Sequence, residues 1–225
     1  GRIIGGHEVK PHSRPYMAYL SITSESKTSQ CGGFLVSPHA VLSAAHCVAG
    51  EMEVTINVTL GAHNRDKKEP EQQVRQVDHW VIHSKYSNGE NDIMLLKLKP
   101  RVKLNRAVKT IPFARRTDYV KPGTTCQAAG WGKTSLNGGS NHVLREVNLK
   151  VQREEVCEEA FDEYLQQSML CAGDKNGKRG DSGGPLVCKR KVHGIVSHGS
   201  EDSLSSTVFT RVSYFEPWIH KELKK

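Results

Sequence analysis

Three residues of this chain have side chains that together could activate a nucleophile. Ser182 lies in "DKNGKRGDSGGP", a run too short and too polar to be packed core, and His46 ends the apolar run "LSAAH". Asp92 directly precedes the apolar run "IMLL". A serine hydroxyl group becomes a strong nucleophile when a histidine takes its proton and a carboxylate orients that histidine. Each residue taken singly is also typical of a turn serine, a loop histidine or a strand cap.

The elements that must position these residues are mostly strands. Short segments that alternate apolar and polar residues recur between Gly, Pro, Asn and Ser clusters, which predicts an antiparallel all-β barrel or sandwich. Two segments have helical periodicity, residues 153–165 and 216–225. Strand signals lapse in "TIPFARRTDYVKPG", which predicts a boundary between a half at 1–113 and a half at 114–225.

The chain of 225 residues carries a formal net charge of +8, which favours contact with polyanions. Lysine and arginine are concentrated in residues 97–109, 114–116 and 189–191. Two interpretations stay open: an ordinary solvated face, or electrostatic storage on a sulfated proteoglycan such as heparin. Nucleic acid is not an expected partner, because reader motifs and interleaved aromatic residues are absent from the sequence.

The cysteines indicate an oxidising compartment. None of the six has a spacing that suits zinc, so we expect a disulfide framework in a secreted or granule-stored protein. No apolar run has transmembrane length, and the opening "GRIIGG" suggests a processed or nearly processed form. Asn57 begins an "NVT" glycosylation sequon. "HWVIH" lacks the glutamate of a metalloprotease motif, so neither a metal nor a cofactor is expected.

Six short segments occur in the order found in the chymotrypsin family of serine proteases, and the resemblance covers essentially the whole chain. The segments are "IIGG" from Ile3, "AAHC", "DIMLL", "GWG" from Gly130, "GDSGGP" and "SHG" from Ser197. "PHSRPYMAYL", "CGGFLV" and "LGAHN" further resemble the branch that is stored in immune granules: granzymes, mast-cell chymases, cathepsin G and duodenase.

The resemblance implies a fold and a set of catalytic roles. The fold is two six-stranded antiparallel β-barrels with a C-terminal helix, and the active site lies between them. His46 is then the general base, Asp92 the orienting carboxylate and Ser182 the nucleophile. The backbone N–H groups of Gly180 and Ser182 form the oxyanion hole, and we expect glycine at 180 because it lets the peptide turn its N–H group toward the cleft.

The resemblance also implies three disulfides and an activation switch. The pairing uses all six cysteines: Cys31–Cys47, Cys126–Cys188 and Cys157–Cys171. In the family, the freed α-ammonium group of the residue at Ile3 pairs with the carboxylate at Asp181. With Gly1 and Arg2 attached this group is an amide, so we hypothesise that cleavage after Arg2 activates the chain. The alternative is that Arg2 is a remnant without biological meaning.

Substrate preference is the least determined inference. The resemblance places the following residues in or beside the specificity pocket: Asn176, Lys178, Arg179, Ser197, Gly199 and Thr207. It also places Trp131 along the substrate-binding strand. A neutral floor at Asn176, an open neck at Gly199 and a narrowed base at Thr207 favour cleavage after large apolar or aromatic residues.

Two features keep other preferences open. The loop at 174–179 is shorter than in the relatives, and the cations of Lys178 and Arg179 in it lie near the expected cleft. Preference for basic or acidic residues, or a weakly competent pocket, therefore remain alternatives. The expected partners are protein or peptide substrates and protein inhibitors. The competing class of function is a protease-shaped heparin-binding or antimicrobial granule protein.

Overall fold

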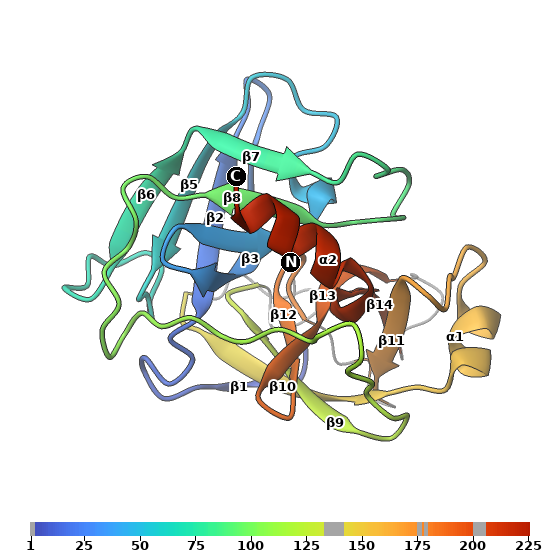
Figure 1. The fold of residues 1–225 in the computed structure, drawn as a ribbon. Helices are drawn as coiled ribbons and strands as arrows, with labels where there is room; N and C mark the ends of the chain where they lie inside the picture. Colours follow the sequence, from blue (N-terminus) through green and yellow to red (C-terminus); the bar gives the residue numbers. More distant parts are fainter. Residues whose placement is uncertain (1–2, 133–141, 175–176, 178–179, 200–205) are drawn as a thin grey trace.

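The structure is a computed structural model of the chain, and it describes residues 3–132, 142–174, 177, 180–199 and 206–225 (Figure 1). Two curled antiparallel sheets make up most of it, and a C-terminal helix lies where they meet. The predictions at Asn176, Lys178 and Arg179, and those at Gly1 and Arg2, fall outside the described residues.

The first sheet closes through a strand that is interrupted once. Its order is β6-β5-β2-β3-β4-β8-β7. Asp78 separates β6 from β7, so one run of chain pairs with β5 through β6 and with β8 through β7. The sheet is thus built from six runs. Its strands are β2 (Met17–Thr23), β3 (Thr28–Ser37), β4 (Ala40–Ser43), β5 (Thr55–Leu60), β6 (Gln73–Val77), β7 (His79–Ile82) and β8 (Met94–Lys97).

The second sheet is a ring of six strands with a seventh added outside. Its order is β1-β10-β11-β14-β13-β12-β9, and β10 also pairs with β9, which closes the ring. Two six-stranded barrels are therefore confirmed; β1 and the break at Asp78 account for the extra strands. The strands are β1 (His7–Glu8), β9 (Thr125–Gly130), β10 (Arg145–Val151), β11 (Met169–Gly173), β12 (Pro185–Cys188), β13 (Lys191–Gly199) and β14 (Ser206–Arg211).

Strand β5 shows why the alternating pattern forms a barrel wall. Ile56, Val58 and Leu60 are fully buried, because residues two apart point to the same face of a strand. Asn57 lies between two of them on the opposite face, where it is half-buried. The glycosylation sequon therefore falls within a strand that is paired on both sides, and glycosylation of Asn57 stays a prediction.

The two helices differ in extent from the predicted ones. Helix α1 (Glu154–Ala160) ends five residues earlier than expected, because Phe161 takes an extended conformation and buries its ring. Helix α2 (Val212–Leu223) begins four residues earlier than expected. Val212, Phe215 and Ile219 follow one helical face and pack into the core of the first sheet.

Each disulfide links two segments of the same sheet, or a sheet and its neighbouring helix. The three disulfides join Cys31 to Cys47, Cys126 to Cys188 and Cys157 to Cys171, which confirms the expected pairing. No helix among the described residues is long and apolar enough to cross a membrane.

Trp131 is part of the core between the sheets and does not line an open substrate strand as expected. It is 2% exposed, its indole N–H group donates to the carbonyl oxygen of His63 at 3.0 Å, and its ring stands edge-on to Tyr19. Because the ring is buried among residues of both sheets, the expectation that this side chain lines the substrate strand is wrong.

Candidate active site

The pairing of two short strands brings His46 and Asp92 together. Strands β4 and β8 are antiparallel with Ser43 opposite Met94, so the residues just after β4 lie beside those just before β8. His46 occupies the short 3₁₀ helix η1 (Ala45–Cys47) that follows β4. Its Nδ1 lies 2.7 Å from Asp92 Oδ2, and its backbone N–H group donates to Asp92 Oδ1 at 2.9 Å.

Asp92 is buried, with 1% of its surface exposed, and donors surround it. The hydroxyl group of Ser197 donates to Oδ2 at 2.6 Å, and Thr210 donates to the backbone carbonyl oxygen of Asp92 at 2.7 Å. Burial alone would raise the pKa of this carboxyl group, but the hydrogen bonds from His46 and Ser197 outweigh burial and lower the pKa. A carboxylate in this state can hold an imidazolium group.

The loop that carries Ser182 is fastened to the other sheet. The carbonyl oxygen of Ser182 accepts the N–H group of Gly32 on β3 at 2.8 Å. Gly183 has a φ of 80°, and a Cβ atom there would lie 2.3 Å from Ser43 Oγ and 2.5 Å from the carbonyl oxygen of Gly32. Only glycine fits at this position. Its absence of a side chain lets the Ser182 loop pack directly on β3 and β4, and β4 leads into His46.

The Ser182 hydroxyl group makes no hydrogen bond within the part of the chain that the structure describes. His46 remains accessible, with 32% of its side chain exposed. Catalytic hydrogen bonds are often long in the absence of substrate and tighten around it. The structure thus brings His46 and Asp92 into contact and places the Ser182 loop against their strands.

Gly180 is held by packing and not by an unusual turn. A Cβ atom at this position would lie 2.9 Å from Ala128 Cβ and 3.1 Å from a Val196 methyl carbon, while its φ is outside the left-handed region. The expectation that glycine is needed here for a turn is therefore replaced by a requirement for space. The N–H groups of Gly180 and Ser182 make no hydrogen bonds to described residues, which leaves both as donors.

Asp181 is buried against the backbone of Gly130 at the end of β9. Its Oδ2 accepts the N–H group of Gly132 at 2.7 Å, and Oδ1 is buried without a hydrogen-bond partner among the described residues. Burial raises the pKa of this carboxyl group. Ile3 is fully buried in the core of the second sheet. An unpartnered buried carboxylate oxygen needs a donor or a cation.

Comparison with known proteins identifies the family. The sequence profile described as Trypsin matches residues 3–219. Granzyme B from Rattus norvegicus is 49% identical over all of this chain and 92% of that protein. Cathepsin G from Homo sapiens is 46% identical over all of this chain and 88% of that protein. A solved structure described as "Structure of GrC" matches 99% of this chain and all of that one, with a TM-score of 0.92 and 46% identity. The chain belongs to the trypsin family.

It is therefore a serine protease with the chymotrypsin-like fold, as the resemblance implied. Sequence reasoning missed three residues that position the triad without belonging to it. Gly183 packs against Ser43 and Gly32, and the Thr210 hydroxyl group donates to the backbone carbonyl oxygen of Asp92. Ser43 and Gly32 lie in or beside quoted motifs, whereas Thr210 is eleven residues beyond "SHG". None of the three has a side chain that suggests chemistry by itself.

The described pocket residues of this trypsin-family protease lie on two neighbouring strands. Gly199 on β13 is paired with Thr207 on β14. Thr207 is buried, and its hydroxyl group has no hydrogen-bond partner among the described residues. Ser197, by contrast, turns its hydroxyl group to Asp92. The pocket role of Gly199 and Thr207 stays a prediction, as does that of the Ser197 backbone.

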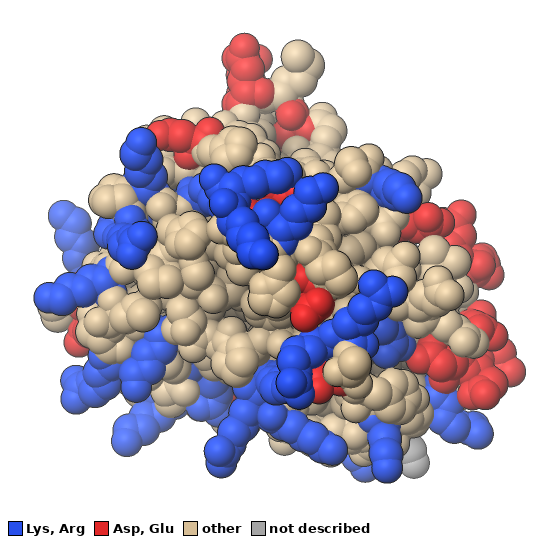
Figure 2. Space-filling view, viewed as in Figure 1, with Lys and Arg blue, Asp and Glu red and all other residues tan. Residues whose placement is uncertain are grey.

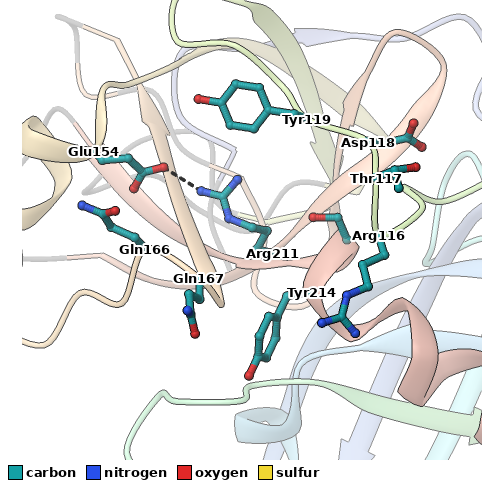
Figure 3. Close-up of a pocket in the computed structure, with 10 residues that line it drawn as sticks. Arg116, Thr117, Asp118, Tyr119, Glu154, Gln166, Gln167, Arg211 and Tyr214 are labelled. Carbon is teal, nitrogen blue, oxygen red and sulfur yellow. Dashed lines mark hydrogen bonds and ion pairs between the residues drawn. The ribbon is translucent and has the colours of Figure 1, made fainter.

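A separate hollow of about 750 Å³ lies between α1, α2 and the segment 116–119 of this protease (Figure 3). Arg211 donates to Glu154 at 2.7 Å across it, and Tyr119 and Tyr214 lie on opposite sides of Arg211. Its lining residues do not include any member of the triad. Arg211 and Glu154 neutralise each other's charge. For these two reasons we assign the hollow no role in catalysis.

Proposed function

We propose that this protease hydrolyses peptide bonds through a covalent acyl-enzyme. Ser182 Oγ adds to the carbonyl carbon as His46 Nε2 takes its proton, and Asp92 holds the resulting imidazolium group. The C–N bond then breaks, and His46 returns the proton to the leaving amine. A water molecule removes the acyl group by the same steps. The contact between His46 and buried Asp92 is the observation that carries this proposal.

The N–H groups of Gly180 and Ser182, which make no hydrogen bonds to described residues, support an oxyanion hole in the same loop. Donors aimed at the developing oxyanion stabilise the transition state by about 2.7 to 4 kcal/mol each. Gly180 can supply its donor because the backbone packs directly on Ala128 and Val196, with no side chain between.

We propose a preference for large apolar or aromatic residues before the scissile bond. The pairing of Gly199 with Thr207 gives the described part of the pocket neutral walls, one of them without a side chain. Lys178 and Arg179 lie outside the described residues and could draw acidic side chains instead. Preference for basic or acidic residues is therefore the alternative outcome of the test below.

We propose that removal of Gly1 and Arg2 activates the protease. The freed ammonium group of Ile3 would supply a partner for Asp181 Oδ1, which has none among the described residues. An α-amino group has an unperturbed pKa of about 7.7 to 8.0, and pairing with a carboxylate raises that pKa. The stabilisation is then complete below pH ~7.7 and is lost as the pH rises through the raised pKa. Activity should accordingly fall only at distinctly alkaline pH.

One experiment tests the mechanism, the switch and the preference together. The chain with and without Gly1 and Arg2 is incubated with a peptide library, beside Ser182→Ala in the shortened form. We expect cleavage by the shortened form only, after large apolar or aromatic residues. Absence of cleavage by both forms would favour the competing view of a protease-shaped binding protein. Equal activity of the long form would contradict the switch.

We also propose secretion and storage in granules, with protein inhibitors among the partners. The support is the similarity to granzyme B, to cathepsin G and to mast cell protease 3 from Ovis aries, together with the three disulfides. Localisation of the tagged full-length precursor in a cell with secretory granules checks this proposal. A diffuse cytosolic signal would contradict it.

A further inference from the structure

A second histidine is joined to the catalytic carboxylate through one serine. Ser197 and His198 are neighbours on β13. Ser197 Oγ lies 2.6 Å from Asp92 Oδ2 and 3.0 Å from His198 Nδ1. His46 Nδ1 contacts the same Asp92 oxygen at 2.7 Å. Asp92 is therefore linked to one imidazole ring directly and to a second one through the Ser197 hydroxyl group.

Counting protons assigns the direction of each hydrogen bond. A hydroxyl group has one hydrogen, and an ionised carboxylate can only accept. The Ser197 hydrogen therefore goes to Asp92, and Ser197 Oγ must accept from His198. The Nδ1 atom of His198 accordingly carries a hydrogen. In the neutral ring this leaves Nε2 as the nitrogen without one.

We propose that His198 is a positioning residue, whose Nδ1–H group holds the Ser197 hydroxyl group in the rotamer that donates to Asp92. This proposal rests on the catalytic roles proposed above, and it deepens them. A serine hydroxyl rotates freely unless a second partner fixes it. With His198 in place, the Ser197 oxygen accepts a hydrogen bond from the His198 ring while the Ser197 hydrogen points to the Asp92 carboxylate.

The surroundings of His198 hold its ring in this orientation. Phe161 stands edge-on to the ring, with 6.1 Å between the centroids and an angle of 89°. Gly89, at a φ of 87°, also leaves space for the ring. A Cβ atom there would lie 3.2 Å from His198 Cε1 and 3.3 Å from Nδ1. A residue with a side chain at 89 would crowd the imidazole away from Ser197.

The charged groups around His198 are consistent with a neutral ring. Although His198 is exposed as a whole residue, loss of solvent around its ring is the largest influence, and it lowers the pKa of His198. Asp92 and Glu163 favour protonation of the ring, whereas His46 opposes it. The neutral ring with hydrogen on Nδ1 is then the form that works with Asp92 at neutral pH.

The tautomer of His198 can be measured without any catalysis. Nitrogen-15 NMR of the imidazole rings is recorded on the Ser182→Ala protein at neutral pH, with His198 assigned by comparison with a further His198→Phe change. We expect the form that is protonated on Nδ1. A ring protonated on Nε2 alone would overturn the proposal, even if the protein proved to be inactive.

Kinetics of the activated enzyme test whether His198 acts through Ser197. His198→Phe keeps a ring but lacks the donor, and we expect kcat to fall about two- to tenfold with little change in KM. His198→Asn places an amide N–H group near the position of Nδ1, so it should retain more of kcat than His198→Phe does. In the Ser197→Ala background, His198→Phe should have no further effect on kcat.

The alternative is that His198 contacts the substrate directly, since it lies on the strand expected to line the substrate. His198→Phe would then change KM, and its effect would persist undiminished in Ser197→Ala. Either result contradicts the positioning role while leaving the proposed peptidase function intact. Absence of all cleavage would contradict the function instead, and the NMR measurement would still decide the proton's place.

Discussion

Asp92 is the residue on which the proposed chemistry depends most directly. Its two oxygens accept hydrogen bonds from the His46 backbone, the His46 ring and Ser197, so donors of the protein compensate its charge. We expect Asp92→Asn to lower kcat by about four orders of magnitude at neutral pH, because an amide no longer enforces the proton on Nδ1 of His46. Steady-state kinetics with an intact far-UV spectrum would check this. A loss of less than about tenfold would argue against the assigned role.

The same carboxylate should make stability depend on pH. The pKa of Asp92 is lowered in the folded state, so its contribution is complete above the unfolded value of about 3.9 and is lost as the pH falls below it. We expect the difference in unfolding free energy between the native chain and Asp92→Asn to shrink between pH 5 and pH ~2. Urea titrations measure it, with the exposed Asp78→Asn as the control. A difference in unfolding free energy that is constant with pH would contradict this expectation.

Two glycines with similar backbones allow a clean test of how Ser182 is seated. Gly183 has a φ of 80° and no room for a Cβ atom, whereas Gly50 has a φ of 81° with nothing within 4 Å of that position. We expect Gly50→Ala to cost only the left-handed strain, about 1 to 2 kcal/mol. Gly183→Ala should cost roughly 2 to 5 kcal/mol, because overpacking is added to that strain.

Activity should separate the two variants more clearly than stability. A shift of the Ser182 loop by about 1 Å would lower kcat about 100-fold, whereas Gly50→Ala should leave kcat unchanged. Comparable kcat values for the two variants would show that the contact with Ser43 and Gly32 does not position the nucleophile.

At this scale the motifs predicted the reactive side chains, but not the atoms that hold them. Spacing in the sequence marked His46, Asp92 and Ser182 as candidates. It carried no signal that Gly180 is required by the side chains of Ala128 and Val196, because those contacts exist only after the barrel has closed. Long-range packing of this kind cannot be read from local sequence.

Among the elements, α1 depends most on a covalent link. It has seven residues, fewer than an isolated helix needs to be stable in water, and Cys157 fastens it to Cys171 on β11. Replacing both cysteines by alanine should lower the unfolding free energy by about 3 kcal/mol, as expected for a loop of 14 residues.

The disulfide between Cys126 and Cys188 provides the comparison for this prediction. It closes 62 residues, so its removal should cost more, about 4 kcal/mol in the chain-entropy description. Denaturant titrations of both double variants measure the two losses. A smaller loss for the longer loop would show that contacts around each disulfide outweigh the entropy of the unfolded chain.

Strands were more predictable than helix ends for a physical reason. Alternation in segments such as β5 follows directly from one buried face, and tertiary contacts then reinforce it. The end of α1 depended instead on Phe161, whose buried ring packs against His198 on β13. A helix of residues 153–165 satisfied the local pattern, but continuation would have moved that ring out of its contact.

Across the whole molecule, opposite charges gather over different parts of the surface. Acidic side chains gather over α1 at the right of the view, and basic side chains along the lower edge (Figure 2). Two segments distant in sequence meet through Ala114, whose N–H group donates to Val192. We call the residues brought together there the basic corner: Arg115, Arg116, Lys189, Arg190 and Lys191.

Within the basic corner, Asp118 is the carboxylate that pairs with both Arg115 and Lys191. Lys189 and Arg190 occupy the exposed turn between β12 and β13. Asp118 pairs with two of the five cations, so the basic corner has an excess of positive charge, which suits a sulfated polysaccharide. The net charge of +8 supplies a weaker attraction from every side.

Heparin affinity chromatography distinguishes the basic corner from general charge. We expect the native chain to elute below about 1 M salt, where electrostatic attraction is screened within about 3 Å. Lys189→Ala with Arg190→Ala should elute at clearly lower salt than Lys67→Ala with Lys68→Ala, an exposed pair with the same change in charge. Equal shifts in elution salt for the two double variants would mean that net charge alone governs binding. Retention that is unchanged above 1 M salt would exclude an electrostatic origin, because attraction between exposed charges does not survive that screening.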